Sequence, residues 1–128
     1  MSDLGRRAEE EGAGYLEGLG WKVLERSFRA GGRGGGVEID LVALDGDTLV
    51  FVEVKARSAA GFGGPEGAVT ASKRVRIARA AALYLSRRGF SGRPVRFDVL
   101  SALPEGPGGR LAFRLLPDAF RSPLRFTL

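Results

Sequence analysis

Residues Val37–Arg57 read V-E-I-D-L-V-A-L-D-G-D-T-L-V-F-V-E-V-K-A-R and contain two apolar runs on either side of the polar segment Asp45–Thr48. Both runs are rich in β-branched residues, and an Asp-Gly pair between such runs is a strong signal for a hairpin. We therefore expect one strand over Val37–Leu44 and a second over Leu49–Lys55.

Four charged residues interrupt these apolar runs: Glu38, Asp40, Glu53 and Lys55. A charge in the core of a sheet costs several kcal/mol unless it is paired or bound to a metal ion. Because side chains alternate between the two faces of a strand, Glu53 and Lys55 point to the same side. These charges therefore need a partner or a function.

The turn of the hairpin decides which residues face one another. A two-residue turn at Asp45 and Gly46 places Asp40 opposite Phe51, whereas a four-residue turn through Thr48 places Asp40 opposite Glu53. Both registers leave Asp40, Glu53 and Lys55 on one face, with Glu38 beside them. Directly opposite residues lie about 5 Å apart, so the hairpin gathers carboxylates and an ammonium into one patch.

Such a patch suits the hydrolysis of phosphodiester bonds. Carboxylates on rigid strands bind Mg²⁺ or Mn²⁺, which prefer oxygen ligands. The metal lowers the pKa of a bound water and neutralises phosphate charge. A lysine beside it orients the attacking water or stabilises the developing negative charge. We therefore predict Asp40, Glu53 and Lys55 as catalytic residues, with Glu38 as a supporting carboxylate.

At these residues the chain resembles the PD-(D/E)xK nucleases, since Asp40 is followed by Glu53-Val54-Lys55. The wider pattern resembles the YraN-like family, small bacterial proteins related to archaeal Holliday-junction resolvases. The matching blocks are Glu38–Val42, Phe51–Arg57, Ala68–Lys73, Arg96–Val99 and Pro117–Phe120. The resemblance covers nearly the whole chain. It implies an endonuclease that uses Mg²⁺ or Mn²⁺ on structured or branched DNA.

The resemblance also adds residues to the site. Glu9 matches the glutamate of the family's first helix, so the implied metal ligands are Glu9, Asp40 and Glu53. From the residues alone, an exposed helix charge is the simpler interpretation of Glu9. The family pattern Val-Thr-x-x-Lys matches Val69, Thr70 and Lys73, which places Thr70 and Lys73 on the substrate side.

Composition excludes several chemistries, and together with the nuclease-like motif it favours a nucleic-acid partner; the charge alone would also fit an arginine-rich surface without a partner. The chain has 128 residues, enough for a single domain over residues 1–128. It has no Cys and no His, which excludes disulfides, thiolate metal sites and serine–histidine triads. The net charge is +5, with 17 Arg against 3 Lys, and guanidinium groups bind phosphate with paired hydrogen bonds. The expected DNA-binding residues are Arg57, Thr70, Lys73, Arg74 and Arg76.

Two helices and three more strands are expected around the hairpin. The first helix spans Ser2–Leu19, with Leu4, Ala8, Tyr15 and Leu19 buried, and the second runs from Thr70, as its N-cap, to about Arg88. Further strands are expected over Trp21–Arg29, Pro94–Leu100 and Leu111–Leu116, before a tail over 117–128. This order predicts an α/β, restriction-endonuclease-like core, a mixed sheet of about five strands flanked by two main helices.

Two other functions stay open. The chain can be a nucleic-acid-binding module that keeps the nuclease fold with little or no cleavage, or the four charges can form a structural salt-bridge network. No apolar run is long enough to span a membrane, so we expect a cytoplasmic protein. Symmetric cleavage of a junction implies a homodimer. Asp98 is a candidate for burial, where it can support either the edge of the sheet or the site, and we favour the structural role.

Overall fold

The computed structural model describes residues 3–30, 36–56, 70–89 and 92–121. The predicted DNA contact Arg57, the glycine-rich segments 31–35 and 58–67, and residues 122–128 of the expected tail lie outside these residues. The elements are α1 (Asp3–Gly18), β1 (Lys22–Ala30), β2 (Val37–Asp45), β3 (Thr48–Ala56), α2 (Ala71–Arg88), β4 (Val95–Glu105) and β5 (Arg110–Leu116).

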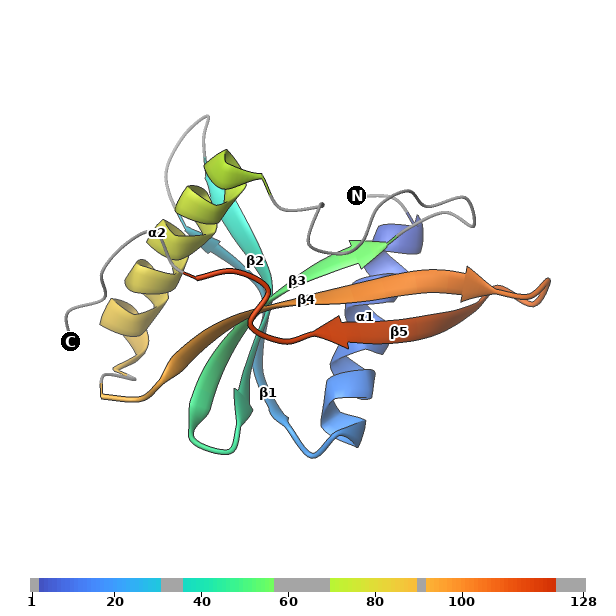
Figure 1. The fold of residues 1–128 in the computed structure, drawn as a ribbon, viewed down its shortest axis with the longest axis horizontal. Coiled ribbons are helices and arrows are strands. Elements are labelled where there is room, and N and C mark those ends of the chain that lie inside the picture. Colours follow the sequence, from blue (N-terminus) through green and yellow to red (C-terminus); the bar gives the residue numbers. More distant parts are fainter. Residues whose placement is uncertain (1–2, 31–35, 57–69, 90–91, 122–128) are drawn as a thin grey trace.

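The five strands form one sheet in the order β1-β2-β3-β4-β5 (Figure 1). All neighbouring pairs are antiparallel except β3 and β4, which are parallel. A parallel pair needs a crossover connection, and α2 provides it. The predicted α/β class, with a mixed five-stranded sheet and two helices, is confirmed.

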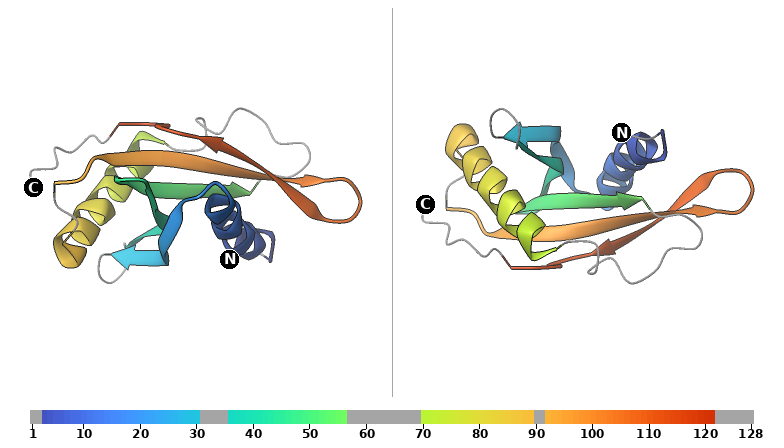
Figure 2. Two further views of the ribbon diagram at one scale, coloured as in Figure 1. Left: turned by 90° about the horizontal axis from the view of Figure 1, so that it is seen from below. Right: turned by 90° about the horizontal axis from the view of Figure 1, so that it is seen from above.

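The two helices pack on opposite faces of β3. Val50 and Val52 contact the core under α1, whereas Leu49 and Phe51 contact the core under α2. All four side chains are nearly inaccessible to solvent, so β3 is apolar on both faces until Glu53. Figure 2 shows that the sheet is strongly twisted, so that β1 and β2 lie between the two helices.

The β2–β3 hairpin adopts the second of the two expected registers. Leu44 lies opposite Leu49 and Asp45 opposite Thr48, so the turn itself consists of Gly46 and Asp47. Gly46 has φ +60°, a conformation that glycine adopts without steric cost. The described pairing ends at Leu41 opposite Val52, and the next residues of the two strands are Asp40 and Glu53.

The buried face of α1 differs from the expectation at its end. Leu19 is 48% exposed, so its predicted burial is wrong, and Leu16 is fully buried instead. The helix ends at Gly18, two residues after Leu16, where Gly20 N–H bonds Glu17 O (2.9 Å) and Trp21 N–H bonds Leu16 O (3.1 Å). These two bonds are those of a Schellman motif, and they leave Leu19 beyond the last helical turn.

The predicted end of the fourth strand at Leu100 is also wrong, because β4 continues to Glu105. Its neighbours hold it on both sides: Ala56 pairs with Ala102 and Arg110 pairs with Glu105. The β4–β5 hairpin therefore reaches well beyond the rest of the sheet (Figures 1 and 2). None of the helices that the structure describes is long and apolar enough to cross a bilayer.

Candidate active site

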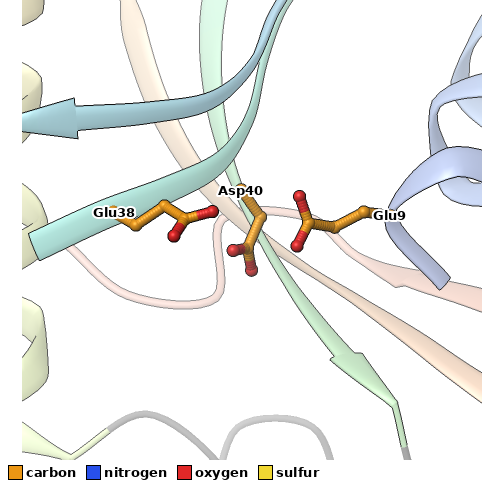
Figure 3. A group of neighbouring side chains, drawn as sticks. All are labelled: Glu9, Glu38 and Asp40. Atoms are coloured by element: carbon orange, nitrogen blue, oxygen red, sulfur yellow. The ribbon is translucent and has the colours of Figure 1, made fainter. Parts of the chain in front are cut away.

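Three carboxylates converge beside the point where β2 and β3 stop pairing. Glu9 comes from α1, and Glu38 and Asp40 come from β2 (Figure 3). One oxygen atom from each lies within 4.8 Å of the others. Glu9 follows Ala8 on the buried face of α1 and is only 7% exposed, so its carboxylate points toward the sheet rather than into solvent. We call Glu9, Glu38 and Asp40 the carboxylate trio.

Asp40 is fixed by the backbone of the neighbouring strand. Its Oδ2 accepts a hydrogen bond of 2.8 Å from the Val54 N–H. This side-chain bond joins β2 to β3 just beyond their last described backbone pair, and it holds Asp40 next to Glu53. Burial and then the charge of Glu53 raise the pKa of Asp40 to about 8, against the opposing effect of the Val54 N–H.

Glu9 accepts a hydrogen bond from a residue that the sequence did not reveal. The Ser27 hydroxyl donates to Glu9 Oε1 at 2.9 Å. Ser27 has φ +52°, a left-handed conformation that non-glycine residues rarely adopt in the middle of a strand. Burial raises the pKa of Glu9, and the charges of Glu38 and Glu53 add to the rise. The Ser27 hydrogen bond and, to a smaller extent, the charge of Arg29 oppose it.

Glu38 is itself one of the three converging carboxylates, whereas the sequence suggested only a supporting carboxylate. Its Oε2 lies 3.5 Å from the guanidinium Nε of Arg29, which is largely exposed. Its other oxygen, Oε1, is buried and has no hydrogen-bond partner among the described residues. Burying a hydrogen-bond acceptor without a donor costs free energy. This oxygen is therefore suited to coordinate a cation or to accept a hydrogen bond from a ligand.

Glu53 has a partner outside the trio. Its carboxylate is nearly buried, and the Lys73 ammonium from α2 lies 2.5 Å from Glu53 Oε1. Glu53, which the sequence predicted as a metal ligand, is therefore close enough to raise the pKa of Asp40. It is nevertheless ion-paired to Lys73. Lys55 is half-buried two residues further along β3 and by alternation lies on the same side of the strand as Glu53.

The other predicted DNA-binding residues lie on α2, outside the trio. Thr70 is the helix N-cap, as expected, and its hydroxyl accepts from the Lys73 N–H at 3.2 Å. The Arg74 guanidinium lies 5.4 Å from the centre of the Phe120 ring. Arg76 is exposed. The structure thus brings Thr70 and Lys73 to the site through the helix cap and the Glu53 ion pair.

The charges of the site do not balance. Glu38 and Glu53 each have a cationic partner, Arg29 and Lys73. Within the ranges that the structure describes, Glu9 and Asp40 form no ion pair, and the pKa of each is raised. Two unpaired carboxylates beside a buried, unpartnered oxygen form a site suited to a divalent cation.

The fold and this site define a small α/β protein whose first helix and central hairpin build an acidic centre. Its sequence matches the model of the Uncharacterised protein family UPF0102 over residues 8–102. The chain belongs to the UPF0102, or YraN, family, so the resemblance seen in the sequence is confirmed.

Relatives in this family match most of the chain. A UPF0102 protein of Symbiobacterium thermophilum is 46% identical over 121 residues, which cover 93% of this chain and 97% of the relative. A UPF0102 protein of Geobacter sulfurreducens is 49% identical over 98 residues, covering 77% of this chain and 73% of the relative. Another from Hahella chejuensis is 40% identical over 118 residues, covering 92% and 90%.

Proposed function

We propose that this protein is a metal-dependent endonuclease that hydrolyses phosphodiester bonds in structured or branched DNA. The observation that carries the proposal is the pair of carboxyls formed by buried Glu9 and half-buried Asp40. Among the residues that the structure describes, neither forms an ion pair, and both lie close enough to Glu53 for its charge to raise their pKa values. A structural salt-bridge network would pair its acids with bases, so the excess of acid favours a bound cation instead.

The residues present fit Mg²⁺ or Mn²⁺. The trio offers only carboxylate oxygens, which these ions prefer, and Glu38 Oε1 is a buried acceptor in need of a partner. Glu9, Glu38 and Asp40 would hold the ion, with Glu53 adjacent to them. When bound, the cation supplies Lewis-acid activation of water and neutralisation of phosphate charge.

The protein's own groups perform the remaining tasks. The Val54 N–H holds the Asp40 carboxylate in one orientation, and the Ser27 hydroxyl does the same for Glu9. Lys55, on the Glu53 side of β3, orients the attacking water or stabilises the negative charge that develops on the phosphate. The exposed Arg76 on α2 provides a contact to the DNA backbone.

Cleavage assays on a panel of labelled DNAs test this proposal. The panel contains a four-way junction, a flap, a duplex, a single strand and an RNA of the same sequence, each incubated with Mn²⁺. We expect wild-type cleavage of the branched substrates, and a loss on the order of 10²-fold or more in Asp40→Asn and Lys55→Ala. Lys22→Ala is the matched control, because Lys22 is an exposed lysine on β1.

The outcome also distinguishes the binding module. Glu53 is satisfied by Lys73 without any metal ion, which is the observation that favours a protein that only binds DNA. If wild type binds DNA in a salt-sensitive way but neither binds Mn²⁺ nor cleaves, the binding module is correct. If Lys55→Ala folds normally and cleaves like wild type, Lys55 is not catalytic. Symmetric cleavage of a junction further requires a two-fold dimer, which sedimentation of the DNA complex would detect.

A further inference from the structure

We infer that Lys73 couples cation binding to phosphate binding at this site. In the cation-free protein Lys73 neutralises Glu53, and when a divalent cation binds, Glu53 turns to the carboxylate trio and releases Lys73 to a phosphate of the DNA backbone. The inference rests on the proposed function, because it assigns a second task to the same site.

The ion pair between Lys73 and Glu53 is the first observation. The Glu53 carboxylate is only 8% exposed, and its partner is the Lys73 ammonium at 2.5 Å. A buried carboxylate is costly without a partner, so Lys73 stabilises the cation-free state. The Lys73 side chain is 30% exposed, so its ammonium has access to solvent when it leaves Glu53.

The position of Glu53 beside the trio is the second observation. Asp40 accepts the Val54 N–H, and Val54 directly follows Glu53 on β3. The charge of Glu53 acts on both Asp40 and Glu9. A divalent cation at the trio therefore attracts the Glu53 carboxylate and repels the Lys73 ammonium, and both effects oppose the ion pair.

The place of Lys73 on α2 is the third observation. Lys73 lies in the first turn of an 18-residue helix, where the helix dipole favours anions. Arg76 follows at i+3 and is exposed, so Lys73 and Arg76 are neighbours on one side of the helix. A released Lys73 and Arg76 together present two cations to a nucleic-acid backbone next to the acidic centre.

This exchange makes the two binding events interdependent. If the cation strengthens phosphate binding by releasing Lys73, the DNA strengthens cation binding by the same factor. Removing the Lys73 charge should therefore have opposite effects on the two ligands. Cation binding in the absence of DNA should become tighter, because Glu53 no longer needs to break an ion pair, and cation-dependent DNA binding should weaken.

Calorimetric titration with Mn²⁺ alone measures the first effect. We expect Lys73→Gln to bind Mn²⁺ more tightly than wild type, on the order of tenfold, a typical strength for coupling between two sites. Arg79→Gln is the matched control: Arg79 is an exposed residue of α2, and its loss removes the same charge without touching Glu53. The inference would be overturned if Lys73→Gln bound Mn²⁺ no more tightly than Arg79→Gln does.

Fluorescence anisotropy with a labelled DNA duplex, with and without Ca²⁺, measures the second effect. Ca²⁺ shares the preference for oxygen ligands, and a gel confirms that the DNA stays intact. We expect Ca²⁺ to strengthen binding by wild type and Arg79→Gln, and much less by Lys73→Gln, while Lys73→Arg retains the effect. An equal gain in Lys73→Gln and Arg79→Gln would overturn the inference. Absence of Mn²⁺ binding by wild type would instead reject the proposed function, and the inference with it.

Discussion

Asp40 holds a carboxyl group in surroundings that favour its protonated form. The hydrogen bond that it accepts from the Val54 N–H stabilises the ionised form, but burial and the charge of Glu53 outweigh that bond and raise the pKa to about 8. Near neutral pH and without a cation, Asp40 therefore retains a proton for much of the time. Binding of a divalent cation displaces this proton, so cation affinity should rise with pH.

This pKa predicts how the stability of the cation-free protein depends on pH. An Asp carboxyl has an ordinary pKa of 3.8, and in the folded protein that of Asp40 is about 8. Between these values the folded state binds more protons than the unfolded state, so the free energy of unfolding falls as pH rises from about 4 to about 8. Urea unfolding at pH 5 and at pH 8 should show this loss in wild type. In Asp40→Asn the fall in the free energy of unfolding should be much smaller, and Glu9 should account for what remains. An equal fall in Asp40→Asn and wild type would contradict the raised pKa of Asp40.

At the residue scale the sequence predicted the members of the site better than their pairing. Asp40, Glu53 and Lys55 were recognisable because a charge inside an apolar strand needs a reason. The Glu53–Lys73 ion pair was not, because side-chain partners depend on which charged groups the fold brings close. Ser27 had no signal at all: its neighbours suggest a regular strand, and only the structure shows its positive φ.

At the element scale, the position of Glu9 depends on how closely α1 approaches the sheet. Gly12 lies on the buried face one turn after Glu9, and a Cβ atom added there would lie 2.9 Å from Leu100 Cδ2. That Leu100 is fully buried, so it has little room to move. Gly14, in the same helix, is exposed and has nothing within 4 Å of such a Cβ atom. The two glycines therefore have different roles.

Alanine substitutions separate these roles. In a helix, alanine is more favourable than glycine by about 1 kcal/mol. Gly14→Ala should therefore raise the free energy of unfolding by roughly 0.5–1 kcal/mol. Gly12→Ala should lower the free energy of unfolding, because the cost of crowding against Leu100 exceeds the gain from placing alanine in the helix. Urea unfolding of both variants measures the difference, and an equal stabilisation by the two would show that α1 can move away from the sheet without cost.

Elements that are marked by a local sequence pattern, such as a turn or a helix cap, were predicted well. Elements whose conformation depends on pairing with neighbouring strands were not. The Asp45-Gly46 pair indicated where the central hairpin turns, and Thr70 marked the start of α2. The second half of β4 was missed because it contains Pro104 and few alternating apolar residues. Its strand conformation comes from pairing with β3 and β5, which no local pattern reveals.

At the scale of the whole molecule, one buried ionic network joins segments that are far apart in the sequence. Asp98 is completely buried, and both its oxygens accept bonds of 2.9 Å from the Arg96 guanidinium. Arg96 also bonds Asp45 and lies over the Trp21 ring. Asp98 Oδ1 further accepts the Asp118 N–H at 2.8 Å. The expected structural role of Asp98 is thus supported by its contacts.

This network explains two of the sequence blocks that resemble the family. The block Arg96–Val99 and the block Pro117–Phe120 contact each other, through Asp98 and Asp118 and through the stacked rings of Phe97 and Phe120, whose centres are 5.0 Å apart. Phe120 is 5% exposed, so the start of the tail packs on the body of the protein. These blocks therefore stabilise the fold, whereas the blocks around Asp40, Glu53 and Lys73 form the candidate site.

The last prediction tests that division. Asp98→Asn keeps the size of the side chain but removes the charge that Arg96 and the Asp118 N–H require. Arg96, whose side chain is 23% exposed, then has Asp45 as its one remaining anionic partner among the described residues. The free energy of unfolding should therefore fall by roughly 2–3 kcal/mol, somewhat less than for a fully buried pair. Asp47→Asn is the matched control, because Asp47 lies exposed in the β2–β3 turn, and its change should stay within about 0.5 kcal/mol. Urea unfolding at pH 7 measures both variants. Equal stability of the two would mean that the Asp98 network contributes little, and that other contacts hold the start of the tail, such as the Phe97–Phe120 stacking and the hydrogen bond of 2.8 Å from the Ala119 N–H to Phe97 O.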